Sequence, residues 1–309
     1  MSTDTDTPAV SIILPVYNER GHIEEEIDRV RRSMDESEFS YEIIVVDDGS
    51  TDGTGDLVRE IDGVRLIQFA DNRGSGSSRR IGTNAARGEI VVWSDADMSY
   101  PNDRMPQLIR ELDGVDQVVG ARTSEKGTAK ALRVPAKWMI RKLASYLMST
   151  PIPDLNSGFR AMRRSVAAQF LHLLPSGFSC VTTITMTFLN NGYSVKYVPI
   201  EYAERAGDSK FHWYRDTKRY LLQVVRLIMM YNPLRVLMPT AVFLFSVGGV
   251  KLVYDLVTKN FRPAANTLLI FSAAFAVVLV AVLADLVVQV SKPQHSIEPA
   301  SVYRTQSLS

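Results

Sequence analysis

Cysteine is almost absent from this chain: Cys180 is the only one among 309 residues. One cysteine excludes a disulfide framework and a metal site built from several thiolates. The four histidines lack metal-ligand spacing, and a net charge of +1 gives no electrostatic reason for a nucleic-acid partner. These absences predict a reducing, cytosolic environment for the main domain.

Targeting and phosphate-loop motifs are missing as well. Residues 1–9 are mainly polar, without the apolar core of a signal peptide, and are predicted to be a disordered tail. The first predicted strand-to-helix turn has no G-x-G-x-x-G, and Gly74-Ser75-Gly76 is not followed by Gly-Lys-Ser/Thr. We therefore expect a bound phosphate to be held by a metal ion and basic side chains.

Long apolar runs are confined to the C-terminal third. Residues 236–250 have almost no polar side chains, and residues 268–290 have few. With its flanks, each run reaches the roughly 20 residues that cross a bilayer. Two buried helices of a large soluble domain are the alternative, but the adjacency of the runs favours a membrane hairpin. The predicted spans are 236–257 and 266–290.

Shorter apolar runs alternate with helical patterns in the first third of the chain. This alternation predicts an α/β fold with a mostly parallel, Rossmann-like sheet. The predicted strands are Val10–Val16, Tyr41–Val46, Val64–Phe69 and Glu89–Ser94. The predicted helices are Ile23–Met34, one that begins near Thr54, and Ser77–Ala86. Ligands of such sheets lie at the carboxyl ends of the strands. Polar clusters expected to converge there are Tyr17/Glu19, Asp47/Asp48 and Asp95/Asp97.

The segment Asp95-Ala96-Asp97 directly follows an apolar strand. Two carboxylates one residue apart can reach one site if the chain turns there. Hard oxygen ligands suit Mg²⁺ or Mn²⁺, and Mg²⁺ typically takes one or two carboxylates together with water and substrate phosphate oxygens. Solvated Asp pairs are common, but the position at a strand end favours a metal site.

Several segments taken together resemble the inverting GT-A glycosyltransferases of family 2. The first of them are Val10 to Glu19, Val45 to Thr54 and Asp95 to Asp97. Asp154-Leu155-Asn156-Ser157-Gly158-Phe159-Arg160 and Arg205-Ala206-Gly207-Asp208-Ser209-Lys210 narrow the resemblance to the dolichol- and polyprenyl-phosphate hexose synthases. It implies a GT-A catalytic domain over residues 10–211, followed by the two-span anchor of the bacterial and archaeal branch.

The resemblance also implies roles for residues of the donor half. The residues expected to bind the nucleotide are Pro15, Tyr17, Glu19, Asp47, Asp95 and Ala96. The expected metal ligands are Asp97, Asp95 and Ser99, with Asp97 the firmest. Ser99 departs from the mannose-synthase pattern, which often has Gln at this position, and a hydroxyl is a shorter and weaker ligand. The donor therefore stays open among UDP-glucose, UDP-N-acetylhexosamine and GDP-mannose, with a slight preference for UDP-sugars.

The acceptor implied by the resemblance is a polyprenyl or dolichyl monophosphate. Its oxygen is anionic near neutral pH, so the reaction requires cations rather than a strong general base. The resemblance singles out Arg122, Arg205 and Lys210, although a solvated surface charge is the alternative for each. Arg133 and Lys137 are equally open between the two interpretations. Asp154 is open between a catalytic base, a group that orients the acceptor, and a cap for the turn after it.

The segments around the spans suggest how the protein meets the membrane. Residues 212–235 mix basic and apolar side chains, which predicts a juxtamembrane amphipathic helix, and residues 129–148 have a similar composition. Basic residues before the first span predict a cytoplasmic catalytic domain on the plasma membrane, with the tail at 291–309 on the same side. Asp285 is costly in lipid unless it is paired, so a homo-oligomeric contact is one hypothesis.

The sequence thus predicts an enzyme that transfers one hexose from a UDP- or GDP-sugar to a polyprenyl phosphate, with Mg²⁺ or Mn²⁺. A membrane glycosyltransferase that extends a glycan is the first alternative, but such enzymes more often carry Gln-x-x-Arg-Trp, which is absent. A non-catalytic membrane scaffold is the second, and it predicts lost carboxylates. Asp47, Asp95 and Asp97 are all present.

Overall fold

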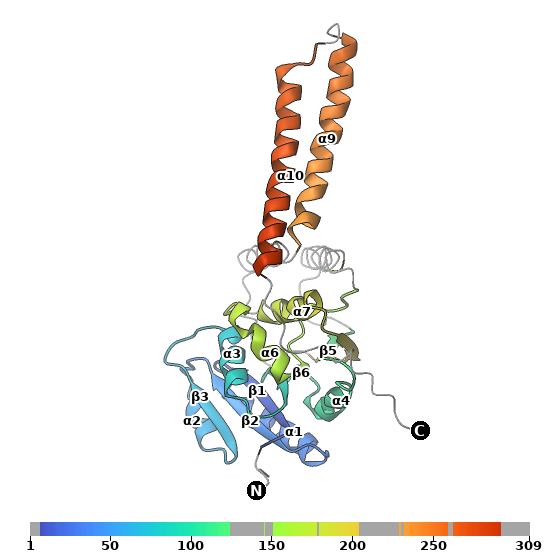
Figure 1. Cartoon of the computed structure of the whole chain (residues 1–309). Coiled ribbons are helices and arrows are strands. Elements are labelled where there is room, and N and C mark those ends of the chain that lie inside the picture. The colour runs from blue at the N-terminus through green and yellow to red at the C-terminus, as the bar shows by residue number, and fades with distance from the viewer. Residues whose placement is uncertain are drawn as a thin grey trace, which may run out of the picture.

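The computed structural model describes residues 7–123, 145, 151–177, 179–203, 229, 232–258 and 262–291. These residues form an α/β domain followed by a pair of long helices (Figure 1). Seven strands make one sheet in the order β3-β2-β1-β4-β6-β5-β7. Their bounds are β1 Val10–Val16, β2 Tyr41–Asp47, β3 Val64–Gln68, β4 Ile90–Trp93, β5 Gln117–Arg122, β6 Arg160–Arg163 and β7 Val195–Ile200.

Most neighbouring strands in the sheet run parallel. β1 pairs in parallel with β2 and β4, β2 with β3, and β5 with β7. Among the described strands, only β6 is antiparallel to its neighbours, β4 and β5. β1 and β2 are buried along nearly their whole length, as expected for strands covered on both faces. The predicted fold, an α/β domain with a mostly parallel sheet, is confirmed.

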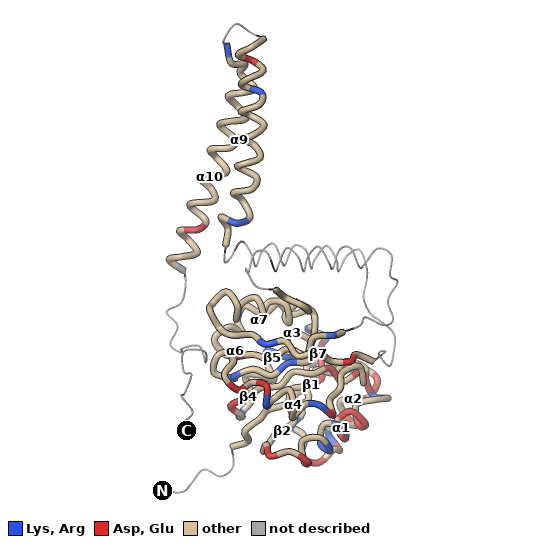
Figure 2. The backbone as a smooth tube through the Cα atoms, turned by 90° about the vertical axis from the view of Figure 1, so that its right-hand side faces the viewer, with Lys and Arg blue, Asp and Glu red and all other residues tan. Residues whose placement is uncertain are grey.

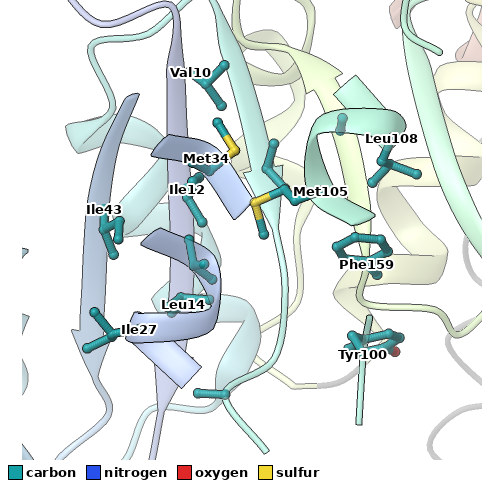
Figure 3. Packing of buried hydrophobic residues seen from close by; sticks show 14 of the residues in the cluster. Val10, Ile12, Leu14, Ile27, Met34, Ile43, Tyr100, Met105, Leu108 and Phe159 are labelled. Atoms are coloured by element: carbon teal, nitrogen blue, oxygen red, sulfur yellow. The ribbon is translucent and has the colours of Figure 1, made fainter. Parts of the chain in front are cut away.

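Helices cover both faces of the sheet. The bounds are α1 Ile23–Asp35, α2 Thr54–Arg59, α3 Ser75–Ala85, α4 Met105–Arg110, α6 Arg164–Phe170 and α7 Cys180–Asn190, with short 3₁₀ turns η1 Asn102–Arg104 and η2 Leu171–Leu173. One apolar cluster joins α1 and α4 to the sheet, and another joins α6 and α7 to its opposite face. Figure 3 shows the first cluster, in which Ile27 and Met34 of α1 lie beside Ile12 and Leu14 of β1.

Helix α3 begins two residues earlier than the sequence predicted. Gly74 adopts a positive φ of 91°, which lets the chain turn directly into the helix. The first helical amides of Gly76 and Ser77 donate to the Ser176 carbonyl at 2.7 and 3.3 Å. A Cβ atom at Gly76 would lie 2.0 Å from the Pro175 carbonyl oxygen, so glycine is required for this approach.

The two C-terminal helices form an antiparallel hairpin. They are α9 Pro233–Thr258 and α10 Ala265–Ser291, close to the predicted spans. At 1.5 Å per residue, a 26-residue helix is about 39 Å long, enough to cross a bilayer. Only 11% and 17% of their most apolar stretches are buried, whereas core helices of a soluble domain would be mostly buried. Charged side chains are sparse along both helices (Figure 2).

Close packing joins the two helices of the hairpin. A Cβ atom at Gly248 of α9 would lie 3.3 Å from side-chain atoms of Ile270 and Phe271, so the small residue lets the helices approach. Phe245 adds ring contacts to Phe271 and Phe275, with centroid distances of 6.0 and 5.1 Å. The hairpin is therefore a packed unit and not two independent helices.

Candidate active site

The candidate site lies where the order of the sheet reverses, between β1 and β4. The two strands pair only as far as Ile13 and Trp93, and β1 then continues to Val16. The chain that leaves β4 therefore runs beside the end of β1, at the carboxyl edge where open α/β sheets bind ligands. β2 is the other neighbour of β1, so the three predicted polar clusters do converge at one edge.

Hydrogen bonds connect the loop after β1 with the loop after β2. The Asn18 amide donates to the Ser50 hydroxyl at 2.9 Å, and the Thr51 amide donates to Asn18 Oδ1 at 2.8 Å. Asn18 has a positive φ of 54°, which Asn tolerates better than most residues. The Glu19 amide donates to the Thr54 hydroxyl at 3.1 Å. Half-buried Tyr17 and Glu19 are thus fixed on a shared rim.

Asp47 and Asp48 accept hydrogen bonds from the loops around this rim. Asp47 is fully buried, and its oxygens accept from the Ser50 amide and from Gln68 Nε2, both at 2.9 Å. Asp48 accepts from the amides of Arg73 and Gly74 at 2.7 and 2.8 Å. Burial raises the pKa of Asp48 above its ordinary value, against the effect of these hydrogen bonds. In this conformation both carboxylates hold loops in place.

The N-terminus of α3 does not serve as a phosphate cradle in this structure. The amides of Gly76 and Ser77 in its first turn donate to the Ser176 carbonyl. The amides of Arg73 and Gly74, just before the helix, donate to Asp48. Helix N-termini bind anions through such amides.

Asp97 occupies a tight turn after β4. The residue is 5% exposed, and its Oδ1 accepts from the Ser99 amide at 3.2 Å and from the Ser99 hydroxyl. Between the two, Met98 has a positive φ of 61°. The turn thus brings Ser99 back onto Asp97, and these two of the three predicted metal ligands are in direct contact.

Asp95 lies in a different environment. Its Oδ1 forms an ion pair with Arg79 of α3, whose side chain is 2% exposed while that of Asp95 is 30% exposed. The Arg79 guanidinium also lies 5.7 Å from the Trp93 ring centroid. Gly158 leaves room for the pair, because a Cβ atom there would lie 3.1 Å from both Asp95 Oδ2 and Arg79 Nη2. Burial disfavours the charge on Arg79, but Asp95 raises its pKa.

These carboxylates fit a cation that shares its shell with a substrate. Among the residues that the structure describes, no three His, Cys, Asp or Glu side chains gather into an all-protein metal cage. Mg²⁺ does not require one, since one or two carboxylates and substrate phosphates suffice. Asp97 with Ser99 supplies such a partial ligand set, whereas part of the Asp95 carboxylate is already engaged by Arg79.

Arg122 and Asp154 form a bidentate ion pair near the end of β5. Arg122 Nε and Nη2 donate to the two Asp154 oxygens at 2.7 and 2.9 Å, and both side chains are about one-tenth exposed. Burial opposes the ionisation of Asp154, but the hydrogen bonds and charge of Arg122 outweigh it and lower the pKa of Asp154. Asp154 also accepts from the Asn156 amide at 2.9 Å, so the predicted turn contact is present.

Two tyrosines lie between the Asp97–Ser99 turn and the Arg122 guanidinium. The Arg122 guanidinium lies 5.2 Å from the Tyr202 ring centroid, and Tyr202 meets Tyr100 edge-on at 5.1 Å. Tyr100 follows Ser99 and accepts from the Gly158 amide at 2.7 Å. A pocket of about 840 Å³ opens beside them, lined by Arg29, Met98, Ser99, Tyr100, Pro101, Asp103, Arg104, Thr123, Glu201, Tyr202 and Ala203.

The sequence missed several residues of this site. Arg79, Tyr100 and Tyr202 were not predicted, although Tyr100 lies only three residues after Asp97. Arg205, Lys210, Arg133 and Lys137 lie outside the described residues, as do most of the two predicted amphipathic helices and of both tails. The structure therefore brings together Asp95, Asp97, Ser99, Arg122 and Asp154 from the predicted set.

Two family models match the chain. Residues 11–171 match "Glycosyl transferase family 2", and residues 232–290 match the "GtrB C-terminal hairpin". The second match covers nearly all of α9 and α10, and together with their exposed apolar surfaces it identifies a membrane protein.

Curated relatives carry names from lipid-linked sugar chemistry. An "Undecaprenyl-phosphate 4-deoxy-4-formamido-L-arabinose transferase" from Aeromonas hydrophila is 30% identical over 67% of this chain and 64% of its own length. A "Polyprenol monophosphomannose synthase" from Mycolicibacterium smegmatis is 31% identical over 66% of this chain and 81% of its own. A "Dolichol-phosphate mannosyltransferase" from Pyrococcus furiosus is 31% identical over 71% and 63%. The chain thus spans slightly less than two-thirds of the length of two of these relatives.

Solved structures support the fold alone. Glucosyl-3-phosphoglycerate synthase from Mycobacterium tuberculosis, in complex with Mn²⁺, uridine diphosphate and glucosyl-3-phosphoglycerate, superimposes with a TM-score of 0.57 at 19% identity, over 72% of this chain and 80% of that one. Mannosyl-3-phosphoglycerate synthase from Rubrobacter xylanophilus gives a TM-score of 0.55 at 21% identity, over 72% of each chain.

Proposed function

The chain belongs to glycosyl transferase family 2, and from this premise we propose that it transfers one hexose from a nucleotide sugar to a polyprenyl monophosphate with inversion at the sugar. The observation that carries the proposal is the meeting of Asp97 and Ser99 with the Arg122–Asp154 pair around Tyr100 and Tyr202. The relatives' names, which specify undecaprenyl, polyprenol and dolichol phosphates, support a lipid phosphate as acceptor.

The donor half lies along the ends of β1, β2 and β4. We assign the nucleotide to the rim formed by Pro15, Tyr17 and Glu19, above Asp47, with Asp95 and Ala96 at its other side. Asp95 is suited to accept a hydrogen bond from a sugar or ribose hydroxyl, because Arg79 fixes its orientation and leaves it partly exposed. The base of the nucleotide is left to experiment.

Asp97 and Ser99 are the residues that we expect to hold a divalent cation, Mg²⁺ or Mn²⁺. When bound, such a cation would neutralise the charge that develops on the departing diphosphate. Asp97 suits this task because hydrogen bonds from Ser99 to its Oδ1 fix the turn that carries it at the end of β4. Asp95 is the weaker candidate ligand, because Arg79 already neutralises part of its charge.

The acceptor half requires positive charge and an orientated phosphate. An oxygen of the lipid phosphate attacks the anomeric carbon while the bond from that carbon to the diphosphate breaks, and the electron pair leaves with the nucleoside diphosphate. Arg122 is placed to attract the incoming phosphate through the side of its guanidinium that Asp154 does not engage, since Nε and Nη2 already donate to Asp154. Asp154 orients Arg122. Arg205 and Lys210, outside the described residues, are proposed as further acceptor contacts.

The membrane hairpin keeps the active site close to the lipid. We place the catalytic domain on the cytoplasmic face of the plasma membrane, because nucleotide sugars are cytosolic and basic residues are dense before α9. Two spans then return the C-terminal tail to the same side. A homo-oligomer held through Asp285 stays a hypothesis.

A donor screen tests the proposed function. The full-length protein in nanodiscs is incubated with undecaprenyl phosphate, Mg²⁺ or Mn²⁺, and in turn UDP-glucose, UDP-N-acetylglucosamine and GDP-mannose, and the lipid is analysed by mass spectrometry. We expect one donor to add the mass of a single sugar residue to the lipid phosphate, a hexose from UDP-glucose or GDP-mannose or an N-acetylhexosamine from UDP-N-acetylglucosamine. Asp97→Asn keeps the side-chain shape but removes the charge, and we expect it to lower the rate by about 100-fold or more.

An exposed aspartate supplies the matched control. Asp113 lies on the surface, and we expect Asp113→Asn to retain the wild-type rate. Full activity of Asp97→Asn would refute the metal assignment. A parallel screen that offers a lipid-linked glycan as acceptor tests the chain-extending alternative, and transfer to that glycan but not to the lipid phosphate would favour it.

A further inference from the structure

A buried glutamate lies beneath the loop that carries Asp97. Glu26 belongs to α1, and it is 0% exposed although the other buried residues of α1 are apolar. A carboxylate is costly to bury without hydrogen bonds. Burial raises the pKa of Glu26, against the effect of its hydrogen bonds and of Arg29. The position of Glu26 therefore calls for an explanation beyond helix packing.

Glu26 binds both halves of the loop from Ser94 to Asn102. Its Oε2 accepts from the Met98 amide at 3.0 Å, and its Oε1 accepts from Asn102 Nδ2 at 2.5 Å. Asn102 Oδ1 in turn accepts from the Ser94 hydroxyl at 2.7 Å. The loop that contains Asp95, Asp97 and Ser99 is thereby fastened at its beginning, its middle and its end.

The hydrogen bond from the Met98 amide to Glu26 lies at a residue with a strained backbone conformation. Met98 has a φ of 61°, a region that disfavours residues other than glycine and that persists only where the surroundings impose it. Asp97 and Ser99 flank Met98, and the left-handed turn lets the Ser99 amide and hydroxyl reach Asp97 Oδ1. The hydrogen bond from the Met98 amide to Glu26 supplies part of what holds this conformation.

Helix α1 adds two further side chains to the same loop. Arg29 lies 3.5 Å from Glu26 and donates to the Tyr100 carbonyl at 3.3 Å. Ser33 donates to the Asn102 carbonyl at 3.0 Å. Glu26, Arg29 and Ser33 are spaced so that they share one side of the helix. One side of α1 thus forms a rigid support for the metal-binding turn.

We propose that Glu26 is a positioning residue that holds Met98 in its left-handed conformation and thereby orients Asp97 toward the divalent cation. This inference rests on the proposed function, because it presupposes that Asp97 binds a cation. Glu26 itself is enclosed, and both of its oxygens are engaged, so it acts through Met98 and Asn102 and does not touch the substrate.

Three variants of the full-length protein test the proposal. Glu26→Ala removes both acceptors and leaves the Met98 amide unpaired. Glu26→Gln can preserve the network, because Gln accepts from the Met98 amide while its NH₂ donates to a flipped Asn102, whose own NH₂ donates to Ser94. Glu25→Ala alters the exposed neighbour on the same helix and serves as the matched control.

The main readout is Mn²⁺ affinity without any turnover. Free Mn²⁺ is measured by electron paramagnetic resonance in the presence of saturating UDP or GDP. In Glu26→Ala the Met98 amide is buried without an acceptor, which disfavours the turn that orients Asp97. We therefore expect about tenfold weaker Mn²⁺ binding for this variant. We expect the Mn²⁺ affinities of Glu26→Gln and Glu25→Ala to stay within about twofold of wild type, because the Met98 amide keeps an acceptor in both variants.

Two results would overturn the proposal: wild-type Mn²⁺ affinity in Glu26→Ala, or a loss in Glu26→Gln as large as in Glu26→Ala. If Glu26→Ala does not fold, hydrogen exchange in the wild type decides, since the Met98 amide is expected to exchange slowly and rapid exchange contradicts the proposal. Absence of Mn²⁺ binding by the wild type with either nucleotide would count against the proposed function instead, and leaves the exchange test of the loop intact.

Discussion

Asp154 shows how a single contact changes the interpretation of a residue. The sequence left it open between a base, an orienting group and a cap. In the structure it forms a bidentate pair with Arg122, and this arginine lowers its pKa against the opposing effect of burial. A carboxylate that is ionised so readily is a poor proton acceptor near neutral pH. Orientation of Arg122 is the role that the geometry favours.

Replacement of Asp154 is expected to affect stability in a pH-dependent way. Asp154→Asn leaves Arg122 buried without its counter-charge, which predicts a loss of about 3–5 kcal/mol at neutral pH. Because the folded-state pKa of Asp154 is lowered, its contribution is present above the ordinary Asp value near 3.9 and disappears as the pH falls through the lowered value. The melting-temperature difference from wild type, in detergent, should be constant from pH 8 to 5.5 and shrink only below about pH 4.

A second arginine–carboxylate pair provides the control. Arg110 and Glu38 are joined bidentately at 2.8 and 2.6 Å, but both side chains are about half exposed. Exposed pairs contribute little, so we expect Glu38→Gln to leave the melting temperature nearly unchanged. Equal effects of the two substitutions would show that burial does not set the strength of the Arg122 pair.

The sequence was enough to select candidate site residues but not to predict which of their side chains pair with one another. Asp95, Asp97, Ser99, Arg122 and Asp154 were all singled out, because strand ends and motif resemblance mark them. The ion pair between Arg79 and Asp95 was not predicted, since it joins a helix and a strand end that no local pattern connects. Glu26 was equally hidden, because it stands in a run of three glutamates, two of which are exposed.

At the scale of elements, the hairpin contains two acidic residues with different environments. The sequence drew attention to Asp285, which accepts from Gln289 Nε2 at 2.7 Å on its own exposed face. Asp255 of α9 is instead 0% exposed and accepts from the Ala264 amide at 3.1 Å and from the Thr267 hydroxyl. Asp255 thus caps the start of α10 from the neighbouring helix.

The cap predicts that Asp255 stabilises the hairpin and that Asp285 does not. Asp255→Ala leaves the Ala264 amide and Thr267 hydroxyl without this acceptor, at a cost of about 1–3 kcal/mol. We expect a lower melting temperature in detergent, together with faster proteolysis of the turn between α9 and α10. Asp285→Ala is the matched control and should match wild type in both measurements. A lower melting temperature and faster proteolysis for Asp285→Ala than for Asp255→Ala would contradict the capping role of Asp255.

Regular elements were predicted in the first third of the chain and in the hairpin, whereas β5, β6, β7, α4, α6 and α7 were not predicted. β1, α1 and the two membrane helices were placed within a few residues, because each carries an extended apolar pattern. β6 was not predicted: it has four residues, two of them arginines, and follows a glycine-containing turn. Its antiparallel insertion between β4 and β5 depends on tertiary pairing that the local sequence does not encode.

At the scale of the whole molecule, the sole cysteine makes the membrane topology accessible to labelling. Cys180 is buried, and burial raises the pKa of its thiol, so it should not react with a maleimide in the folded protein. Cysteines introduced at exposed positions then report on each side separately. Glu60 lies on the catalytic domain and Arg262 lies in the turn between α9 and α10, and both are exposed.

The proposed topology predicts opposite labelling of these two positions. With a membrane-impermeant maleimide on intact bacterial cells, Arg262→Cys should react, whereas Glu60→Cys should react only after the cells are made permeable. The wild type is the control and should stay unlabelled in both conditions. Helices about 39 Å long exceed the roughly 30 Å of bilayer hydrocarbon, so the turn is expected to emerge on the far side. Labelling of both positions under the same condition would mean that the hairpin does not cross the membrane.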